Sequence, residues 1–174
     1  MTMKIRRNLF SSPLCLALNL ALVYVVYEIC RFVYLFENWS TFSMDLSWAS
    51  LGEILRGGWF FDTSAILYTN ALYALLMLLP LHYKETDWWQ RMARWVFVVC
   101  NALCVVANLA DAVYFQYTGR RTTVTVFSEF SNEHNLGSIF GVELLRHWYL
   151  VLIGVALIYG LWRCYFMPRP GERP

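Results

Sequence analysis

The sequence predicts an all-α integral membrane protein with four transmembrane helices and short amphipathic interfacial helices on the outer face. Of its 174 residues, 59% are hydrophobic and only 15% are charged, whereas soluble domains average roughly 45–50% apolar and about 25% charged residues. The apolar residues form four blocks, each near the ~20 residues that cross a bilayer. Trp and Tyr gather at the block edges, as in interfacial aromatic belts.

The four blocks define a membrane domain over residues 1–167, followed by a cytoplasmic tail at 168–174. The predicted spans are residues 13–36, 61–81, 95–117 and 149–167. The first block resembles a signal peptide, but it is too long, carries two charges and lacks a small-residue cleavage site. We therefore expect it to be an uncleaved anchor helix.

The orientation follows from the Lys/Arg bias of short loops. Basic residues lie before the first span, between the second and third, and after the fourth, at Lys4, Arg6, Arg7, Lys84, Arg91, Arg94, Arg163, Arg169 and Arg173. The two longer loops carry more acidic than basic residues. We therefore expect a multi-pass protein with both termini in the cytoplasm and both longer loops outside.

Both outer loops carry helical patterns. In the first, apolar residues recur at helical spacing at Trp48, Leu51 and Leu55. Ser50 and Glu53 resemble a capping box, and Gly57 with Gly58 is expected to stop this short helix. The second loop has two apolar stripes, at Val124, Phe127 and Phe130 and at Ile139, Phe140, Leu144 and Leu145. These helices either lie in the outer headgroup plane or pack on the bundle.

Charged and polar residues inside the spans mark a candidate site, because such groups are costly in a membrane. The predicted intramembrane network comprises Glu28, Arg31, Asp62, Asn108 and Asp111. Glu28 and Arg31 share one helix face and can neutralise each other. The network holds three acids and one base, so a further positive charge is needed. The simplest source is Arg120 or Arg121, if one of them folds back toward the span. The alternative is that the network only fixes helix packing.

Other chemistry is not indicated. The three histidines, at His82, His134 and His147, lack metal-ligand spacing, and five cysteines make a disulfide framework improbable. A net charge of +2 without a basic stripe excludes a nucleic-acid partner. We predict no catalytic residue, metal site or cofactor in this chain. Asn38, Trp39 and Ser40 form a glycosylation sequon, which has meaning only in a eukaryotic secretory host.

Two stretches carry a family resemblance. One is the run Gly-Trp-Phe-Phe-Asp at 58–62, and the other is the run from Asn108 to Thr123. The motif residues of the two runs are Gly58, Phe61, Tyr114, Phe115 and Thr118. Together they resemble the amino-terminal transmembrane region of the lipoteichoic-acid-synthase-like family of Bacteroidota. These proteins are sulfatase-fold phosphoglycerol transferases of the alkaline phosphatase superfamily. The resemblance covers about residues 50–150, and Phe60 stands where a basic residue is expected.

The resemblance implies a membrane-anchoring module in the bacterial cytoplasmic membrane, with phosphatidylglycerol-like lipids as partners at its outer face. The family continues into a fifth span and an extracytoplasmic catalytic domain with a threonine nucleophile and a divalent metal. We expect this chain to be a truncated or split module, inactive alone, that serves such a domain in cis or in trans. Arg120 and Arg121 would hold a lipid phosphate, with Asp62 and Asp111 orienting them.

Two other functions remain open from the residues alone. The chain could be a free-standing membrane scaffold or accessory subunit whose outer helices dock a partner. A small transporter or channel subunit is less favoured, because polar residues do not line a path across both leaflets.

Overall fold

The computed structural model describes residues 12–43, 47–79, 86–122 and 142–168, and every element within these ranges is helical. The named helices are α2 (Ser12–Glu37), α3 (Trp39–Phe42), α4 (Trp48–Thr69), α5 (Ala71–Leu78), α6 (Asp87–Thr118) and α9 (Trp148–Arg163). Two of them, α2 and α6, are long and apolar enough to cross a membrane, and α4 with α5 is a third if this bent pair is one span. Helix α9 is apolar but shorter.

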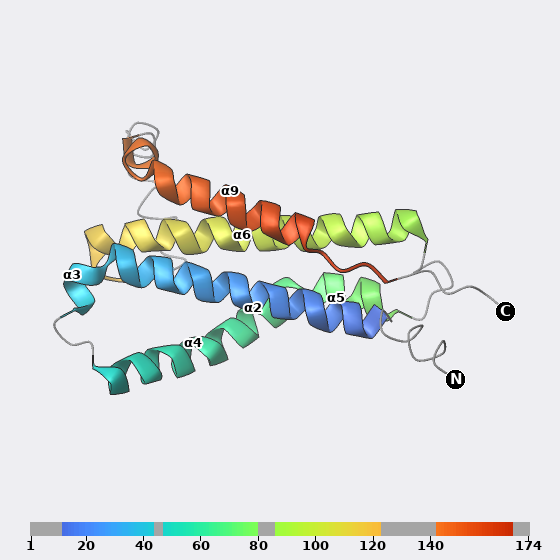
Figure 1. Ribbon diagram of the computed structural model, residues 1–174, viewed down its shortest axis with the longest axis horizontal. Helices are drawn as coiled ribbons and strands as arrows, with labels where there is room; N and C mark the ends of the chain where they lie inside the picture. Colours follow the sequence, from blue (N-terminus) through green and yellow to red (C-terminus); the bar gives the residue numbers. More distant parts are fainter. Residues whose placement is uncertain (1–11, 44–46, 80–85, 123–141, 169–174) are drawn as a thin grey trace.

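The helices run up and down along one long axis (Figure 1). Helices α2, α6 and α9 lie side by side, and α5 packs against α2 and α6. The end of α2, the start of α4, the end of α6 and the start of α9 all lie at the end of the molecule that carries α3. We call this the α3 end. The connections from α2 to α4 and from α5 to α6 are short, which favours antiparallel neighbours.

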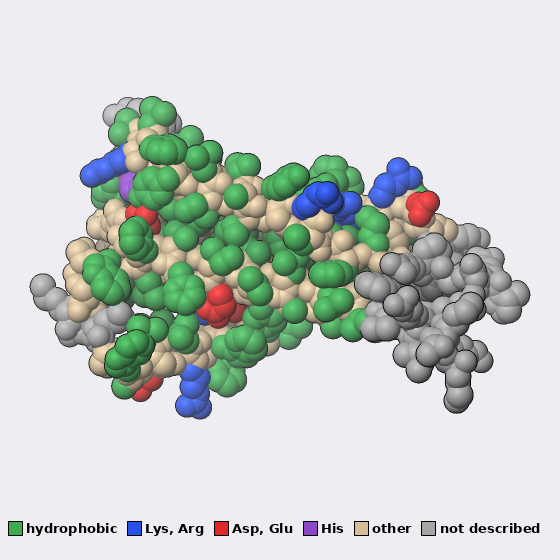
Figure 2. All heavy atoms as spheres, in the orientation of Figure 1, with side chains coloured by type: hydrophobic (Ala, Val, Ile, Leu, Met, Phe, Trp, Pro, Cys, Tyr) green, Lys and Arg blue, Asp and Glu red, His purple; other side chains and the backbone are tan. Residues whose placement is uncertain are grey.

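The core is a narrow seam between helices, and the outside is apolar too. On α2 the buried positions recur at helical spacing, at Cys15, Asn19, Val23, Val26 and Cys30. Many large apolar side chains face outward instead, among them Leu103, Val106, Leu152, Val155 and Tyr159. Figure 2 shows hydrophobic side chains over most of the visible helical surface. Helices that are apolar all round are typical of a protein surrounded by lipid.

The prediction that Gly57 and Gly58 stop a separate outer helix is wrong. Helix α4 begins at Trp48 and continues through both glycines to Thr69. Its capping box is formed by Ser47 and Ser50 rather than by Ser50 and Glu53. An interior glycine costs a helix only about 1 kcal/mol, which a helix of 22 residues tolerates. The predicted outer helix and the first part of the predicted second span are therefore one element.

The second predicted span, 61–81, is interrupted at Asn70, where α4 and α5 meet at 59°. The side chain of Asn70 donates back to the carbonyl of Ile66 at 3.0 Å. It also pairs reciprocally with Asn101 of α6, with Nδ2 to Oδ1 distances of 3.1 and 2.7 Å. Both asparagines are buried. The bend is thus tied to α6 by two amide hydrogen bonds.

Replacing Asn101 with leucine is expected to destabilise the protein by about 1–2 kcal/mol, because it leaves the buried amide of Asn70 without this partner. The Asn70→Leu/Asn101→Leu double variant should lose less than the two single losses added together. Unfolding in detergent micelles, followed by tryptophan fluorescence, measures both. Strict additivity would show that the two side chains do not act as a pair.

The other spans differ from prediction at their ends. Helix α2 matches 13–36 closely, whereas α6 begins at Asp87 instead of residue 95. Helix α9 ends at Arg163, and residues 165–168 continue without helix although the predicted span reached 167. In the second outer loop, residues 142–146 are helical, while the stripe at 124–130 and residues 139–140 lie outside the described residues, as does most of the tail at 168–174.

Candidate functional site

Arg31 of α2 lies between two carboxylates. Its Nη1 is 2.5 Å from Oε1 of Glu28, one helical turn earlier, and its Nη2 contacts the carboxylate of Asp62 on α4. The three side chains are 13%, 28% and 19% exposed, respectively. Two acids share one base, so this triad has a surplus negative charge when all three groups are ionised. It joins α2 to α4.

Helix α4 crosses the guanidinium of Arg31 at Gly58. A Cβ atom placed on Gly58 would overlap the end of the Arg31 side chain, whereas one on Gly57 would meet nothing within 4 Å. Next to this contact, the ring of Tyr24 stacks on Trp59 at 4.8 Å, and its hydroxyl donates to Thr63 Oγ1 at 2.8 Å. The glycine of the first motif therefore makes room for Arg31.

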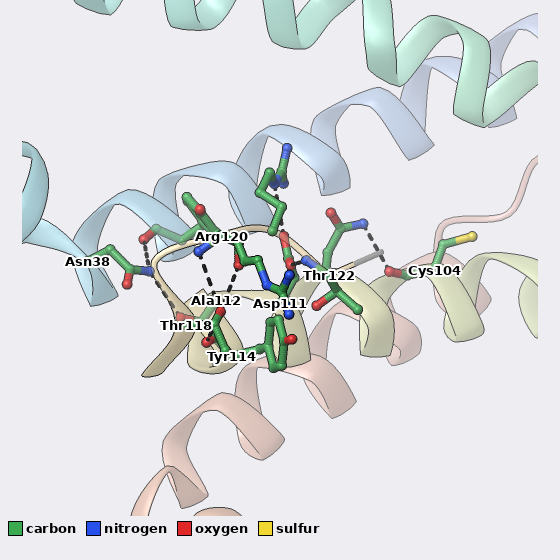
Figure 3. Close-up of polar contacts among 11 residues, drawn as sticks. Asn38, Cys104, Asp111, Ala112, Tyr114, Thr118, Arg120 and Thr122 are labelled. Atoms are coloured by element: carbon green, nitrogen blue, oxygen red, sulfur yellow. Dashed lines mark hydrogen bonds and ion pairs between the residues drawn. The ribbon is translucent and has the colours of Figure 1, made fainter. Parts of the chain in front are cut away.

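Arg121 forms a second charged cluster nearer the α3 end. Gly119 ends α6 in a left-handed conformation, with φ of 64°, which glycine adopts without a Cβ penalty. The chain then folds back along α6. The Nε of Arg121 donates to Asp111 Oδ2 at 2.9 Å, and the amide of Thr122 donates to Asp111 Oδ1 at 2.5 Å. Figure 3 shows this loop closed over Asp111.

The Arg121 guanidinium remains open on its outer side. Its Cζ lies 5.0 Å from the ring centre of Tyr34 on α2, which is a cation–π contact. The side chain is nevertheless 66% exposed, while Asp111 is 10% exposed. Among the described residues, its only hydrogen bond is the one from Nε to Asp111. The two Nη groups carry four N–H donors, and none of them is hydrogen-bonded to another described residue.

Of the remaining motif residues, Thr118 contacts this loop, Phe115 contacts α3, and Phe61 lies on α4. The hydroxyl oxygen of Thr118 lies 3.0 Å from the carbonyl oxygens of both Tyr114 and Arg120. Phe115 stacks on Phe42 of α3, with ring centres 5.6 Å apart. Phe61 is exposed on α4. The side chain of Arg120 is exposed.

The predicted network is divided into separate clusters. Asp62 pairs with Arg31 rather than with Arg121, so among the described acidic residues Asp111 is the one that pairs with Arg121. Asn108 donates to the carbonyl of Cys104 on its own helix at 2.9 Å, and among the described residues it has no hydrogen bond to another helix. The two clusters are separate because α4 contacts α2 at Gly58, beside Arg31, and not at the end of α6, where Arg121 lies.

Sequence reasoning missed two polar residues that join distant segments, Asn19 of α2 and Asn38 at the junction of α2 and α3. Asn19 exchanges hydrogen bonds with the backbone of Phe166 at 3.0 and 2.9 Å, and its Nδ2 lies 2.7 Å from the Tyr73 hydroxyl. Asn38 bonds to α6 near Asp111. Single asparagines in apolar stretches were the only signal, and the sequence did not specify their partners.

The described residues contain neither a cluster of metal ligands nor a disulfide. Within the described ranges no three His, Cys, Asp or Glu side chains are arranged to hold a metal ion. All five cysteines are free thiols. His147 contacts Glu143 one turn earlier, with Nδ1 3.3 Å from Oε2.

Comparisons of this chain with known protein families, with curated proteins and with solved structures give no match.

Proposed function

We propose that the chain crosses the membrane four times, with α4 and α5 forming one bent crossing and α9 with the residues after it forming another. The up-and-down order of the helices supports an even number of crossings. The positive-inside rule favours the α3 end as the outer end, with both termini in the cytoplasm. Arg121 and its neighbours would then lie at the outer headgroup level, with the Arg31 triad deeper in the membrane.

We propose that this module binds the phosphate of anionic, phosphatidylglycerol-like lipids on behalf of a sulfatase-family phosphoglycerol or phosphoethanolamine transferase. The observation that carries the proposal is the guanidinium of Arg121, which is held from one side by Asp111 and Tyr34 and open on the other. Arginine binds phosphate oxygens through paired N–H donors. The resemblance of both motifs to the lipoteichoic-acid-synthase-like family supports the choice of lipid.

In this proposal the chain binds and orients the lipid and performs no bond-making step. Asp111 fixes the guanidinium through Nε, so that both Nη groups face the phosphate of the lipid. Tyr34 limits the tilt of the guanidinium plane. Arg120, adjacent in the chain and exposed, adds positive charge at the same level. The transfer reaction belongs to an extracytoplasmic catalytic domain acting in cis or in trans.

The Arg120→Gln/Arg121→Gln double variant is expected to bind phosphatidylglycerol about 10–100-fold more weakly, because hydrogen bonds to a charged group contribute about 1.5–3 kcal/mol. The measurement is native mass spectrometry of the protein titrated with phosphatidylglycerol in phosphatidylcholine nanodiscs. The matched control is Arg91→Gln/Arg163→Gln, which removes two exposed arginines away from the α3 end. Equal losses in both double variants would reduce the effect to general charge attraction and contradict a specific site.

A free-standing accessory subunit is the second candidate, and one observation favours it. Helix α4 carries exposed aromatic residues along its length, including Trp48, Phe60 and Phe61, and its start diverges from α2 toward the α3 end (Figure 1). Such a surface suits a partner helix as well as lipid. Photocrosslinking from Phe60 in native membranes separates the two: crosslinks to lipid alone favour the headgroup-binding module, and a single protein adduct favours the subunit.

A further inference from the structure

Asn38 occupies the break between α2 and α3. It is 2% exposed. Its backbone N–H donates to the carbonyl of Tyr34 at 3.1 Å, and its carbonyl accepts from Thr41 at 3.0 Å and from Phe42 at 3.3 Å. The backbone of this one residue thus ends the long helix and begins the short one.

The side-chain amide of Asn38 makes two further hydrogen bonds in different directions. Its Nδ2 donates to the carbonyl of Tyr34 at 2.9 Å and to the carbonyl of Ala112 on α6 at 3.0 Å. Both N–H donors of the amide are therefore used. Figure 3 shows Asn38 reaching from α2 to the turn of α6 that carries Asp111 and Ala112.

These two acceptors belong to the two supports of Arg121. Tyr34 supplies the ring beneath the guanidinium, and Ala112 directly follows the aspartate that holds Nε. A single amide therefore fixes the separation of the ring and the carboxylate. Aromatic contacts also pack this end, with Tyr34 and Phe115 centred 5.4 Å apart, but such contacts tolerate sliding. Hydrogen bonds to two carbonyls do not.

The chemistry of this position requires an amide on a short stem. Aspartate would place carboxylate oxygens against two carbonyl oxygens, and alanine would remove both side-chain hydrogen bonds. The same geometry bears on the sequon that begins at Asn38. Its amide nitrogen is buried and uses both hydrogens, so a glycan at Asn38 is incompatible with this fold.

We propose that Asn38 is a positioning residue for the anion site at Arg121, setting the distance between Tyr34 and Asp111 so that the guanidinium faces a lipid phosphate. This inference rests on the proposed headgroup binding. It adds that the site is built from α2 and α6 jointly, and that its affinity depends on a residue that does not touch the ligand.

The test compares Asn38→Ala with Asn19→Ala in phosphatidylcholine nanodiscs titrated with phosphatidylglycerol. Asn19 is an equally buried asparagine within α2, with bonds to Tyr73 and Phe166 far from Arg121 in the sequence. Both variants should lose similar stability. Only Asn38→Ala should lose affinity, by about tenfold, as expected when a charged group loses its alignment. Inorganic phosphate, added as a competitor, distinguishes a site for free phosphate from one for lipid.

A double variant separates positioning from general damage. If Asn38 acts through Arg121, adding Asn38→Ala to Arg121→Gln should cause no further loss of affinity. An additive loss, or wild-type affinity in Asn38→Ala, would overturn the inference while the proposed function stands. Unchanged binding by Arg121→Gln itself would instead overturn the proposed function, and this inference with it.

Discussion

Replacing Arg31 with methionine is expected to lower the free energy of unfolding by about 3–5 kcal/mol, because removing one member of a buried ion pair leaves its partner uncompensated. Here the loss leaves two carboxylates, Glu28 and Asp62, facing each other between α2 and α4. Among the described residues, neither carboxylate forms an ion pair with another cation. Denaturant unfolding in detergent micelles, followed by tryptophan fluorescence, measures the change.

The control removes the whole triad. A Glu28→Gln/Arg31→Met/Asp62→Asn variant keeps the shapes of the acids without their charge, and it should recover most of the lost stability. An Arg31→Met protein as stable as the wild type would mean that the triad contributes nothing, and that the acids are neutralised in some other way. A triple variant no more stable than Arg31→Met would point to the volume of the side chain rather than its charge.

Replacing Gly58 with alanine is expected to destabilise the protein by about 2 kcal/mol, although alanine normally favours a helix by about 1 kcal/mol. The added methyl group would occupy the space of the Arg31 guanidinium. Arginine can move its flexible end, but only by leaving one or both carboxylates. The same unfolding measurement applies, and circular dichroism shows whether α4 stays helical.

Gly57→Ala is the matched control, since its Cβ would meet nothing within 4 Å. We expect this variant to be neutral or more stable. The effect of Gly58→Ala should also disappear when Arg31 is already methionine. If Gly58→Ala is harmful in that background too, the glycine serves the approach of another part of α4 and not the passage of Arg31.

Much of the helical framework could be predicted from hydropathy. The ends of α2 follow directly from one apolar block that only Glu28 and Arg31 interrupt, and these two residues form the pair that a three-residue spacing predicts. The ends of α4 could not be predicted in the same way. Glycine is a common stop signal, but the local sequence does not reveal that Gly58 faces an arginine of another helix.

The polar site was predictable in its parts and not in its connections. Residues inside the apolar blocks were identified because charge there is costly, and the return of Arg121 to Asp111 follows from their proximity along the chain. Partners from different helices depend on rotation and tilt, which composition does not determine. Asp62 therefore joins Arg31, and the short polar side chain of Asn38 gave no sign of its contact with Ala112.

Helices α6 and α9 pack together although they have 32 and 16 residues, or about 48 and 24 Å of rise. A hydrocarbon layer of about 30 Å cannot match both lengths. Lipid next to α9 would have to thin, while α6 would have to tilt or extend into water. The lipid around the protein would therefore differ in thickness between the α9 side and the α6 side. Bilayers of different acyl-chain length should change the packing of α9 on α6. A change in membrane thickness would thus act on this bundle at the side of the short helix α9 and not evenly around it.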